Sequence, residues 1–310
     1  MKKQHLILTF LLIFQALFTF GQSPLSAGEH YADINEVKIH YFVRGKGPVC
    51  LVPTPGWGPS MNYLKNSMGP LENKFTMVYY DTRLSGKSTG PADTTKYSSN
   101  DFMNDMDGLR VHLKQDKVWI MGHSMGGFQV LYYGIHKQEN LNGIIALHPM
   151  AGQDSLYYAE FSKMVMKRKG QPYFEKGADI FSGKDTTKYG TNEMMGYIFP
   201  FYFHNVQKIK DFEKLGNPEI NDKVYEYITN AKFGTDYLFL ELNKIKIPTL
   251  VVAGDDDFIC DKVSQADRII KEIPNASLIV LKDAGHFGWV EQPEQFFAQT
   301  KKWLKKQKIK

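Results

Sequence analysis

Ser124 stands in a glycine-rich turn, Gly-His-Ser-Met-Gly, which follows an apolar run of strand type and precedes a helix-like pattern. A tight strand-to-helix turn exposes a serine hydroxyl at the edge of a sheet, above the N-terminus of the next helix. Such a turn needs glycine wherever a Cβ would strike neighbouring backbone, and we expect those contacts at Gly122 and Gly126. The pattern predicts that Ser124 is a nucleophile. The alternative is an ordinary glycine-rich turn with an inert serine.

A serine hydroxyl is a poor nucleophile unless a base accepts its proton. His286 is the best candidate among the nine histidines, because it follows a strand-like run and stands in the sequence Ala-Gly-His-Phe-Gly. A third group must orient the imidazole and stabilise its cation. Asp255, Asp256 and Asp257 follow another strand-like run, and spacing alone does not choose among them.

The elements that would position these residues alternate between short β-branched runs and helix-like segments, which predicts an α/β fold with a mostly parallel central sheet and flanking helices. Each candidate residue follows a predicted strand, so that loops bring all of them to the edge of the sheet. The predicted strands are Val37–Val43 in an opening hairpin, Val49–Pro53, Thr76–Asp81, Val118–Gly122, Gly143–Leu147, Thr249–Gly254 and Ser277–Leu281. The predicted helices include Phe128–His136 and a terminal helix at Glu291–Leu304.

A long segment, residues 149–245, interrupts this alternation. It holds 18 of the 38 phenylalanines and tyrosines and has helix-like stretches without a convincing series of strands. We predict that it is a helical cap inserted into a core domain formed by residues 22–148 and 246–310. Its aromatic side chains could pack against the core or line an apolar substrate pocket, and both uses are compatible.

These features resemble the α/β-hydrolase superfamily, and within it proline iminopeptidases and cap-bearing carboxylesterases. The resemblance implies a Gly-x-x-Asp pattern for the acid, which selects Asp257 through its spacing from Gly254. Residues 80–88 resemble the family's Asp-x-Arg-Gly-x-Gly-x-Ser loop, with Leu84 in place of the first glycine. For Arg83 in this loop we expect a structural role.

Two backbone N–H groups should stabilise the negative oxygen that develops during acyl transfer. The turn at the nucleophile supplies Met125. The resemblance places the second donor after the strand at 49–52, where the family has His-Gly and this chain has Pro55-Gly56. Proline has no N–H group, so Trp57 is the candidate for the second donor.

The predicted function is hydrolysis of a small, mostly apolar ester, lactone or amide through an acyl-enzyme formed on Ser124. A proline iminopeptidase-like aminopeptidase is the first alternative, although the cap lacks the tryptophan that accompanies the amine-binding glutamate of that group. A ligand-binding sensor on a hydrolase scaffold is the second, suggested by the altered oxyanion loop. A lyase that uses the same three residues is the third.

The N-terminus predicts export. Lys2 and Lys3 precede an apolar run over residues 6–20, and small residues follow near Gly21, as in a signal peptide cleaved after residue 21. An uncleaved anchor is the alternative. We expect a periplasmic or secreted protein with no further membrane-spanning segment.

The remaining composition narrows the possible partners. The net charge of +5 comes largely from a lysine-rich C-terminus, which predicts no basic face for nucleic acid. Neither a metal-ligand cluster nor a dinucleotide-binding glycine loop is present, so we expect no cofactor and no metal. Cys50 and Cys260 are expected to be buried free thiols, and the oligomeric state is left open.

Overall fold

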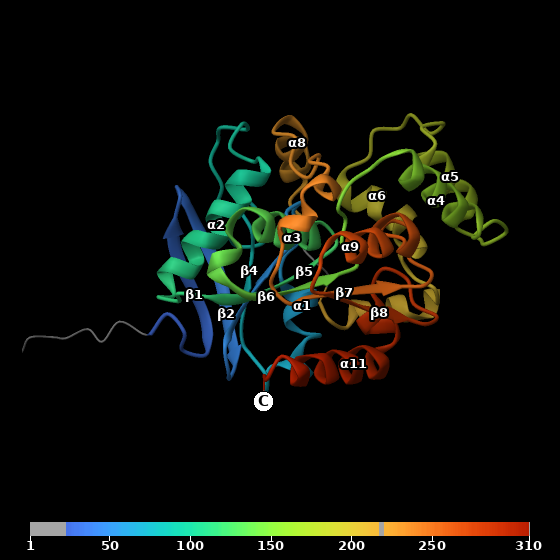
Figure 1. The fold of residues 1–310 in the computed structure, drawn as a ribbon. Helices are drawn as coiled ribbons and strands as arrows, with labels where there is room; N and C mark the ends of the chain where they lie inside the picture. Colours follow the sequence, from blue (N-terminus) through green and yellow to red (C-terminus); the bar gives the residue numbers. More distant parts are fainter. Residues whose placement is uncertain (1–22, 217–219, 310) are drawn as a thin grey trace, which may run out of the picture.

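The computed structural model describes residues 23–216 and 220–309 and contains one eight-stranded sheet, in the order β1-β2-β4-β3-β5-β6-β7-β8 (Figure 1). Strand β2 is antiparallel to both of its neighbours, and every other pair of adjacent strands is parallel. The mostly parallel sheet predicted from sequence is therefore confirmed. The strands are β1 Gly28–Ile34, β2 Val37–Gly45, β3 Val49–Pro53, β4 Thr76–Tyr80, β5 Val118–His123, β6 Leu141–Leu147, β7 Thr249–Gly254 and β8 Ala276–Leu281.

The central strands are apolar on both faces, as β4 illustrates. Met77 and Tyr79 belong to the hydrophobic cluster on one face, whereas Val78 and Tyr80 belong to the cluster on the other face, and all four are buried. Successive side chains of a strand point to opposite faces, so a strand with this composition requires a cover on each side.

Helices provide both covers. Side chains of α2, α3 and α9 contribute to the first cluster, and side chains of α1 and α11 contribute to the second. Figure 1 shows α11 on the face of the sheet opposite to α2, α3 and α9. These helices are α1 Asn62–Lys65, α2 Ser99–His112, α3 Met125–Lys137, α9 Asp267–Glu272 and α11 Pro293–Lys306.

The predicted terminal helix at Glu291–Leu304 is wrong in one respect, because the structure divides this region into two helices. The short helix α10 covers Gly288–Glu291, and α11 begins at Pro293. Between them Gln292 has φ −129° and ψ 57°, outside the helical region. The proline ring disfavours a helical conformation in the residue that precedes it, which explains the break.

The segment between β6 and β7 is helical, with one isolated β-bridge from Ile220 to Pro59 of the core. We call residues 149–245 the cap, although its predicted boundaries stay a prediction. Its α-helices are α4 Ser155–Met166, α5 Phe174–Phe181, α6 Thr191–Ile198, α7 Ile209–Glu213 and α8 Asp222–Asn230.

Two smaller predictions concern cysteines and membranes. Cys50 and Cys260 are both buried and free, as expected. Among the helices of the described ranges, none is long and apolar enough to cross a bilayer. The predicted signal peptide lies outside the described residues, so cleavage and export stay predictions.

Candidate active site

Ser124 occupies the turn between the last residue of β5, His123, and the first residue of α3, Met125. Its backbone has φ 59° and ψ −120°, a region that non-glycine residues rarely adopt. Its N–H group donates to the carbonyl of Leu147 at 2.9 Å, which ties the turn to the end of the neighbouring strand. The side chain is partly exposed although the rest of the turn is mostly buried. Strain of this kind is common where a reactive side chain must be presented.

The close contacts that require glycine around this turn were only partly predicted from the sequence. A Cβ at Gly122 would lie 2.0 Å from the carbonyl oxygen of Gly126, so the expected contact there is confirmed. The expectation for Gly126 is wrong, because a Cβ at that position would meet only ordinary contacts, the nearest at 3.5 Å. The second tight position is Gly127, where a Cβ would lie 2.7 Å from Cα of Pro149, on the chain that leaves β6.

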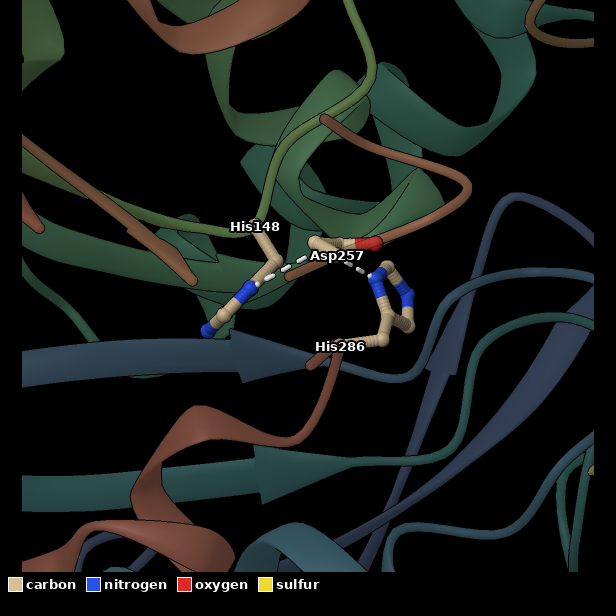
Figure 2. A group of neighbouring side chains, drawn as sticks. All are labelled: His148, Asp257 and His286. Atoms are coloured by element: carbon tan, nitrogen blue, oxygen red, sulfur yellow. Dashed lines mark hydrogen bonds and ion pairs between the residues drawn. The ribbon is translucent and has the colours of Figure 1, made fainter. Parts of the chain in front are cut away.

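The imidazole of His286 and the carboxylate of Asp257 lie in direct contact (Figure 2). Nδ1 of His286 is 2.8 Å from Oδ2 of Asp257, and both side chains are buried. Asp257 follows β7, and His286 follows β8. Of the three neighbouring aspartates, Asp255 is exposed and Asp256 faces the cap, so Asp257 is the one placed to orient this histidine.

Asp257 accepts four hydrogen bonds. Its Oδ1 accepts the backbone N–H groups of Ile259 at 3.1 Å and Cys260 at 3.0 Å, while Oδ2 contacts Nδ1 of His286 and Nδ1 of His148. Burial alone would raise the pKa of this carboxyl, but the positive charge of His286 and the hydrogen bonds from both histidines hold the pKa well below its usual value. The carboxylate is therefore ionised and stabilises a protonated imidazole.

His148 is a site residue that was not predicted from the sequence. Its Nδ1 lies 3.0 Å from Oδ2 of Asp257 (Figure 2). Its position directly after a central strand, as for the other site residues, was the signal that could have identified it. Within the described part of the chain, His148, Asp257 and His286 are also the one group of side chains close enough to hold a metal ion. The distances between their nitrogen and oxygen atoms are those of hydrogen bonds.

Ser124 lies at the same edge of the sheet, but its hydroxyl makes no hydrogen bond to His286 among the described residues. Such bonds often tighten only in the complex with substrate. Cys260, in the loop after β7, is buried and interacts with both Ser124 and Asp257. Burial raises its pKa, the negative charges of Asp257 and Asp261 add to the shift, and the hydroxyl of Ser124 opposes it.

His123, the residue before the serine, supports the loop of the predicted base. Its Nε2 is 3.0 Å from the carbonyl oxygen of His286, and its Nδ1 is 3.1 Å from the hydroxyl of Tyr63. A carbonyl can only accept, so Nε2 carries the proton and Nδ1 accepts from the tyrosine. This role of His123 was not predicted from the sequence either.

The predicted oxyanion donors belong to two segments that touch. Met125 is the first residue of α3, where backbone N–H groups lack partners within the helix. The loop that contains Trp57 lies against this end of the helix, because a Cβ at Gly126 would be 3.5 Å from the carbonyl of Pro53 and 3.7 Å from Cα of Pro55. The structure thus brings the two predicted segments together, and the assignment of Met125 and Trp57 as donors stays a prediction.

The loop of the predicted second oxyanion donor is held in place by a buried pair of threonines. The hydroxyls of Thr54 and Thr82 are 2.7 Å apart, and the N–H group of Thr82 donates to the hydroxyl of Thr54 at 3.1 Å. Gly56 and Gly58 have φ values of +84° and +112°, which favour glycine on either side of Trp57. The position of this loop therefore depends on backbone conformation and on the segment that begins at Thr82.

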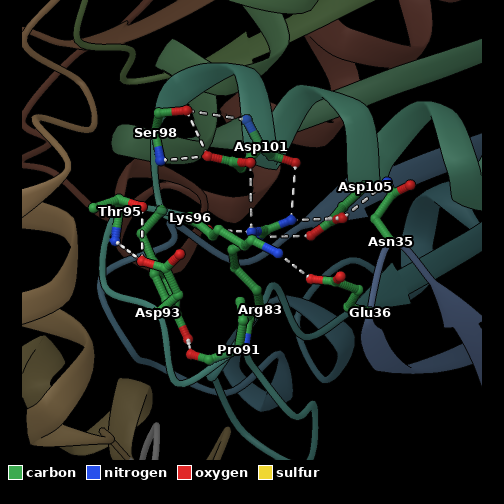
Figure 3. Close-up of polar contacts among 11 residues, drawn as sticks. Asn35, Glu36, Arg83, Pro91, Asp93, Thr95, Lys96, Ser98, Asp101 and Asp105 are labelled. Carbon is green, nitrogen blue, oxygen red and sulfur yellow. Dashed lines mark hydrogen bonds and ion pairs between the residues drawn. The ribbon is translucent and has the colours of Figure 1, made fainter.

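Arg83 anchors that segment to α2 (Figure 3). Its Nε and Nη2 contact the two carboxylate oxygens of Asp105, each at 2.8 Å, and both side chains are 3% exposed. Its Nη1 also donates to the carbonyl of Lys96. This network agrees with the structural role expected for Arg83. The next residue, Leu84, has φ 59°, which explains why a glycine suits this position in the resembling loops.

The cap touches the loop of the predicted base through residues 202–205, which we call the cap contact segment. The carbonyl of Tyr202 accepts the N–H group of His286 at 2.7 Å. The carboxylate of Glu291 joins the two loops, because Oε1 accepts the N–H group of Asn205 at 2.8 Å and Oε2 accepts that of Gly285 at 2.6 Å.

The same segment reaches the loop of the predicted acid through Asp256. Nδ1 of His204 is 3.0 Å from Oδ2 of Asp256, while Lys167 at the end of α4 contacts Oδ1 at 2.6 Å. The buried guanidinium of Arg168 donates to the carbonyl of Asp256 at 2.8 Å. The cap is thus bonded to the residue adjacent to Asp257 as well as to His286.

Many of the cap aromatics pack against the core, as predicted, whereas their use as the lining of a substrate pocket stays a prediction. Some pack against Phe287 of the core, among them Phe203 and Phe212, with ring centroids 5.2 and 4.5 Å away. The ring of Tyr202 lies edge-on to the ring of His286, with centroids 5.4 Å apart. Tyr202 and Phe161 also pack against Phe258, the residue after Asp257, at centroid distances of 4.9 and 5.6 Å.

This fold and this arrangement of residues define a class. Residues 51–293 match the family described as alpha/beta hydrolase fold, and the chain belongs to that family. It is a hydrolase of the α/β-hydrolase type, as the resemblance implied.

Particular relatives show how broad that class is. The proline iminopeptidase of Saccharolobus solfataricus is 24% identical over 301 residues, covering 90% of this chain and 93% of that protein. Among solved structures, an alpha/beta fold family hydrolase from Bacillus anthracis str. Sterne has a TM-score of 0.72 at 21% identity and covers 89% of this chain and 98% of its own. The enol-lactonase from Burkholderia xenovorans LB400 has a TM-score of 0.64 at 19% identity and covers 89% of this chain and 100% of its own.

Proposed function

We propose that this hydrolase cleaves a small, mostly apolar ester or lactone by acyl transfer to Ser124. The observation that carries the proposal is the 2.8 Å contact between Asp257 and His286 at the same edge of the sheet at which Ser124 occupies a strained strand-to-helix turn. A buried carboxylate that orients an imidazole toward an accessible serine hydroxyl is the arrangement that activates a serine nucleophile.

In the first step, Oγ of Ser124 attacks the carbonyl carbon while Nε2 of His286 accepts the hydroxyl proton. The carbonyl oxygen becomes negative and is stabilised by the N–H groups of Met125 and Trp57. Collapse of this intermediate breaks the bond to the leaving alcohol, which receives the proton from His286.

In the second step, His286 accepts a proton from water, and the resulting hydroxide equivalent attacks the acyl-enzyme. The second tetrahedral intermediate collapses to the carboxylic acid and the free serine, which regains its proton from the same imidazole. Asp257 stays ionised throughout and stabilises the imidazolium that forms in each step. In a lactone, the alcohol and the acid belong to one molecule.

The composition of the cap supports the proposal that the substrate is apolar. Its described carboxylates are all partly or fully exposed, and Asp154 and Asp185, for example, are paired with Arg268 and Lys176. A site that binds a free amine needs a carboxylate that is both close and unpaired, since burying a lone ammonium group is costly. Tyr202, a partly exposed cap aromatic whose ring lies edge-on to His286 at 5.4 Å, offers apolar surface beside the predicted base instead.

An aminopeptidase of the proline iminopeptidase type is the second candidate. Its support is the similarity of nearly the whole chain to the proline iminopeptidase of Saccharolobus solfataricus. The cap of this chain contains no tryptophan, whereas Trp57, Trp119, Trp289 and Trp303 all lie in the core. Recognition of a free N-terminus would then have to use a cap glutamate or aspartate.

A direct comparison of substrates tests the proposal. The purified protein would be assayed on a short aryl ester, a small lactone and a prolyl anilide, with the Ser124→Ala variant as the blank. We expect turnover of the ester and the lactone, and a loss of about 10⁶-fold in kcat for Ser124→Ala. The folded state of the variant would be checked by its thermal unfolding transition.

Each outcome has a definite meaning. Anilide cleavage without ester cleavage would favour the aminopeptidase, and retained turnover in Ser124→Ala would contradict the acyl-enzyme mechanism. Shifts in unfolding temperature on ligand addition, without product, would favour a sensor. Reaction in ¹⁸O-labelled water distinguishes hydrolysis, which incorporates the label into the acid, from a lyase reaction.

A further inference from the structure

His148 lies at the centre of the predicted site, although the reaction as described above does not use it. It follows β6 directly, with φ 44°, and its N–H group donates to the carbonyl of Val252 in β7 at 2.7 Å. Strand β6 lies between β5, which leads to Ser124, and β7, which leads to Asp257. The ring therefore lies between the strands of the nucleophile and the acid, and it is fully buried.

Two imidazoles share one carboxylate oxygen. Oδ2 of Asp257 is 2.8 Å from Nδ1 of His286 and 3.0 Å from Nδ1 of His148 (Figure 2). The oxygen of an ionised carboxylate can only accept, so both nitrogens carry a proton when both bonds are formed. The other oxygen is occupied by two backbone N–H groups, and the carboxylate is held in a fixed plane.

The proton of His148 can be assigned from its surroundings. Its Nε2 is buried and has no partner among the described residues. A proton on Nε2 would be an orphaned buried donor and would leave lone pairs of Nδ1 and Oδ2 facing each other at 3.0 Å. The N–H group of Gly254, 3.3 Å from Nδ1, is the competing contact and is longer and uncharged. Burial also lowers the pKa of His148, so the ring is neutral with its proton on Nδ1.

We propose that His148 is a positioning residue for hydrolysis, which donates from Nδ1 to Oδ2 of Asp257 and thereby fixes this carboxylate for His286. The inference rests on the proposed function, because it assigns the acid and the base to Asp257 and His286. His148 itself touches neither the substrate nor Ser124 in this mechanism.

The shared oxygen has two effects on His286. The bond from His148 prevents rotation of the carboxylate, so that Oδ2 stays directed at the base. It also draws part of the negative charge away from His286, because each donor to an anion weakens the others. Removing His148 should misplace the carboxylate in a fraction of molecules, and should make His286 hold its proton more tightly in those that stay aligned.

Other titratable groups lie near Asp257 and His286, and they must be the same in every variant that is compared. His123 lies at the end of β5, Tyr202 is on the cap, and Cys260 and Asp261 are in the loop after β7. Glu291 reaches the loop of the base through Gly285. None of them is altered by a substitution at residue 148, so differences between variants report on that residue.

Two substitutions separate positioning from packing. His148→Leu keeps an apolar side chain of similar size and removes the donor, whereas His148→Asn leaves an amide that can donate from nearly the same place. We expect His148→Leu to lower kcat about 10- to 100-fold with little change in KM, which is the effect of losing a hydrogen bond to a charged group. The acidic limb of the kcat/KM profile should move to higher pH. His148→Asn should recover most of kcat and restore the profile.

A role in packing alone predicts the opposite order, because leucine fills the apolar site better than asparagine does. Higher activity for His148→Leu than for His148→Asn, or an unshifted profile in His148→Leu, would overturn the proposal. His136→Leu, the same substitution at an exposed histidine of α3, is the matched control and should leave the rate and the profile unchanged. The unfolding temperature of each variant shows whether it is folded at the temperature at which its rate is measured.

A second measurement needs no turnover. Imidazole N–H protons bound to a buried carboxylate give resolved low-field signals in proton NMR, and the protein should show two of them, one from each histidine. The Ser124→Ala variant should keep both signals, and His148→Leu should lose one. Loss of neither signal would show that His148 does not donate to Asp257. If Ser124→Ala stays active, the proposed function fails, while this spectrum still decides whether the carboxylate is shared.

Discussion

The two sides of the predicted site are held in different ways. On the acid–base side, Asp257 is buried among side chains that bond directly to its carboxylate. On the oxyanion side, the predicted donors are backbone N–H groups whose positions depend on Thr82 and Arg83, which lie outside the reaction itself. A substitution can delete a carboxylate but cannot delete a backbone N–H group, except by proline. We therefore expect changes on the first side to remove activity, and changes on the second side to lower stability first.

The largest effect should follow from Asp257→Asn. The amide cannot stabilise the imidazolium and favours the wrong tautomer of His286, so kcat should fall about 10⁴-fold. The measurement is kcat on the aryl ester, corrected for the blank rate of Ser124→Ala. Activity within tenfold of the unaltered protein would show that Asp257 is not the acid.

The same substitution also changes the acid stability of the protein. The pKa of Asp257 is lowered on folding, because the charge of His286 and two imidazole hydrogen bonds outweigh the effect of burial. Its ionised form therefore adds stability above the unfolded pKa of about 3.9, and this stability is lost as the pH falls through the folded value. Urea unfolding between about pH 4 and pH 2 should show a weaker pH dependence in Asp257→Asn than in the unaltered protein.

An intermediate effect should follow from Arg83→Gln, which leaves the buried carboxylate of Asp105 without its bidentate partner. The free energy of unfolding should fall by about 3 to 5 kcal/mol. Because the predicted oxyanion donors are backbone N–H groups that survive this substitution, kcat per folded molecule should change by less than about tenfold. Arg44→Gln is the matched control, since Arg44 makes an ion pair with Glu72 but is 41% exposed, and it should cost less than about 1 kcal/mol. Equal losses of unfolding free energy in the two variants would show that the buried ion pair of Arg83 stabilises the protein no more than the exposed ion pair of Arg44.

The smallest effect should follow from Thr82→Val, which removes one hydroxyl of the threonine pair. We expect a loss of about 1 kcal/mol in the free energy of unfolding, measured in urea. The N–H group of Thr82 still reaches Thr54, so the loop should stay in place and kcat should fall only a few-fold. Thr82→Ser keeps the hydroxyl and should behave almost like the unaltered protein. A loss of activity as large as that of Asp257→Asn would show that the oxyanion side is as sensitive as the acid–base side.

The sequence predicted most of the sheet, because buried strands have continuous apolar runs. Strands β3 and β7 match the prediction at both ends, whereas β6 begins at Leu141, two residues earlier than predicted. Asn142 is exposed and interrupts the apolar run, so the continuous apolar pattern of the strand begins only after it. The cap helices could not be bounded in the same way, since several are only five to nine residues long and present no sustained period.

The candidate site was predictable as far as local spacing defines it. Ser124 and His286 follow from turns that contain glycine, and the structure places His286 against Asp257. The contacts of His148 and His123 were not predictable, because they join residues more than 100 positions apart in the chain. The place of His148 directly after a central strand marks it as a candidate but does not indicate its partner. Its function depends on which loop the fold brings next to it.

The cap contact segment has a consequence for how new specificities could arise in this protein. Two of its bonds use the carbonyl of Tyr202 and the N–H group of Asn205, which every side chain except proline at 205 would preserve. Helices α5 and α6, which lie between the contacts of Lys167 and Arg168 with Asp256 and those of residues 202–205, can therefore exchange side chains without moving His286. Libraries directed at residues 174–198 should yield altered substrate ranges in folded enzymes, whereas insertions within 202–205 should uncouple the cap from the reaction altogether.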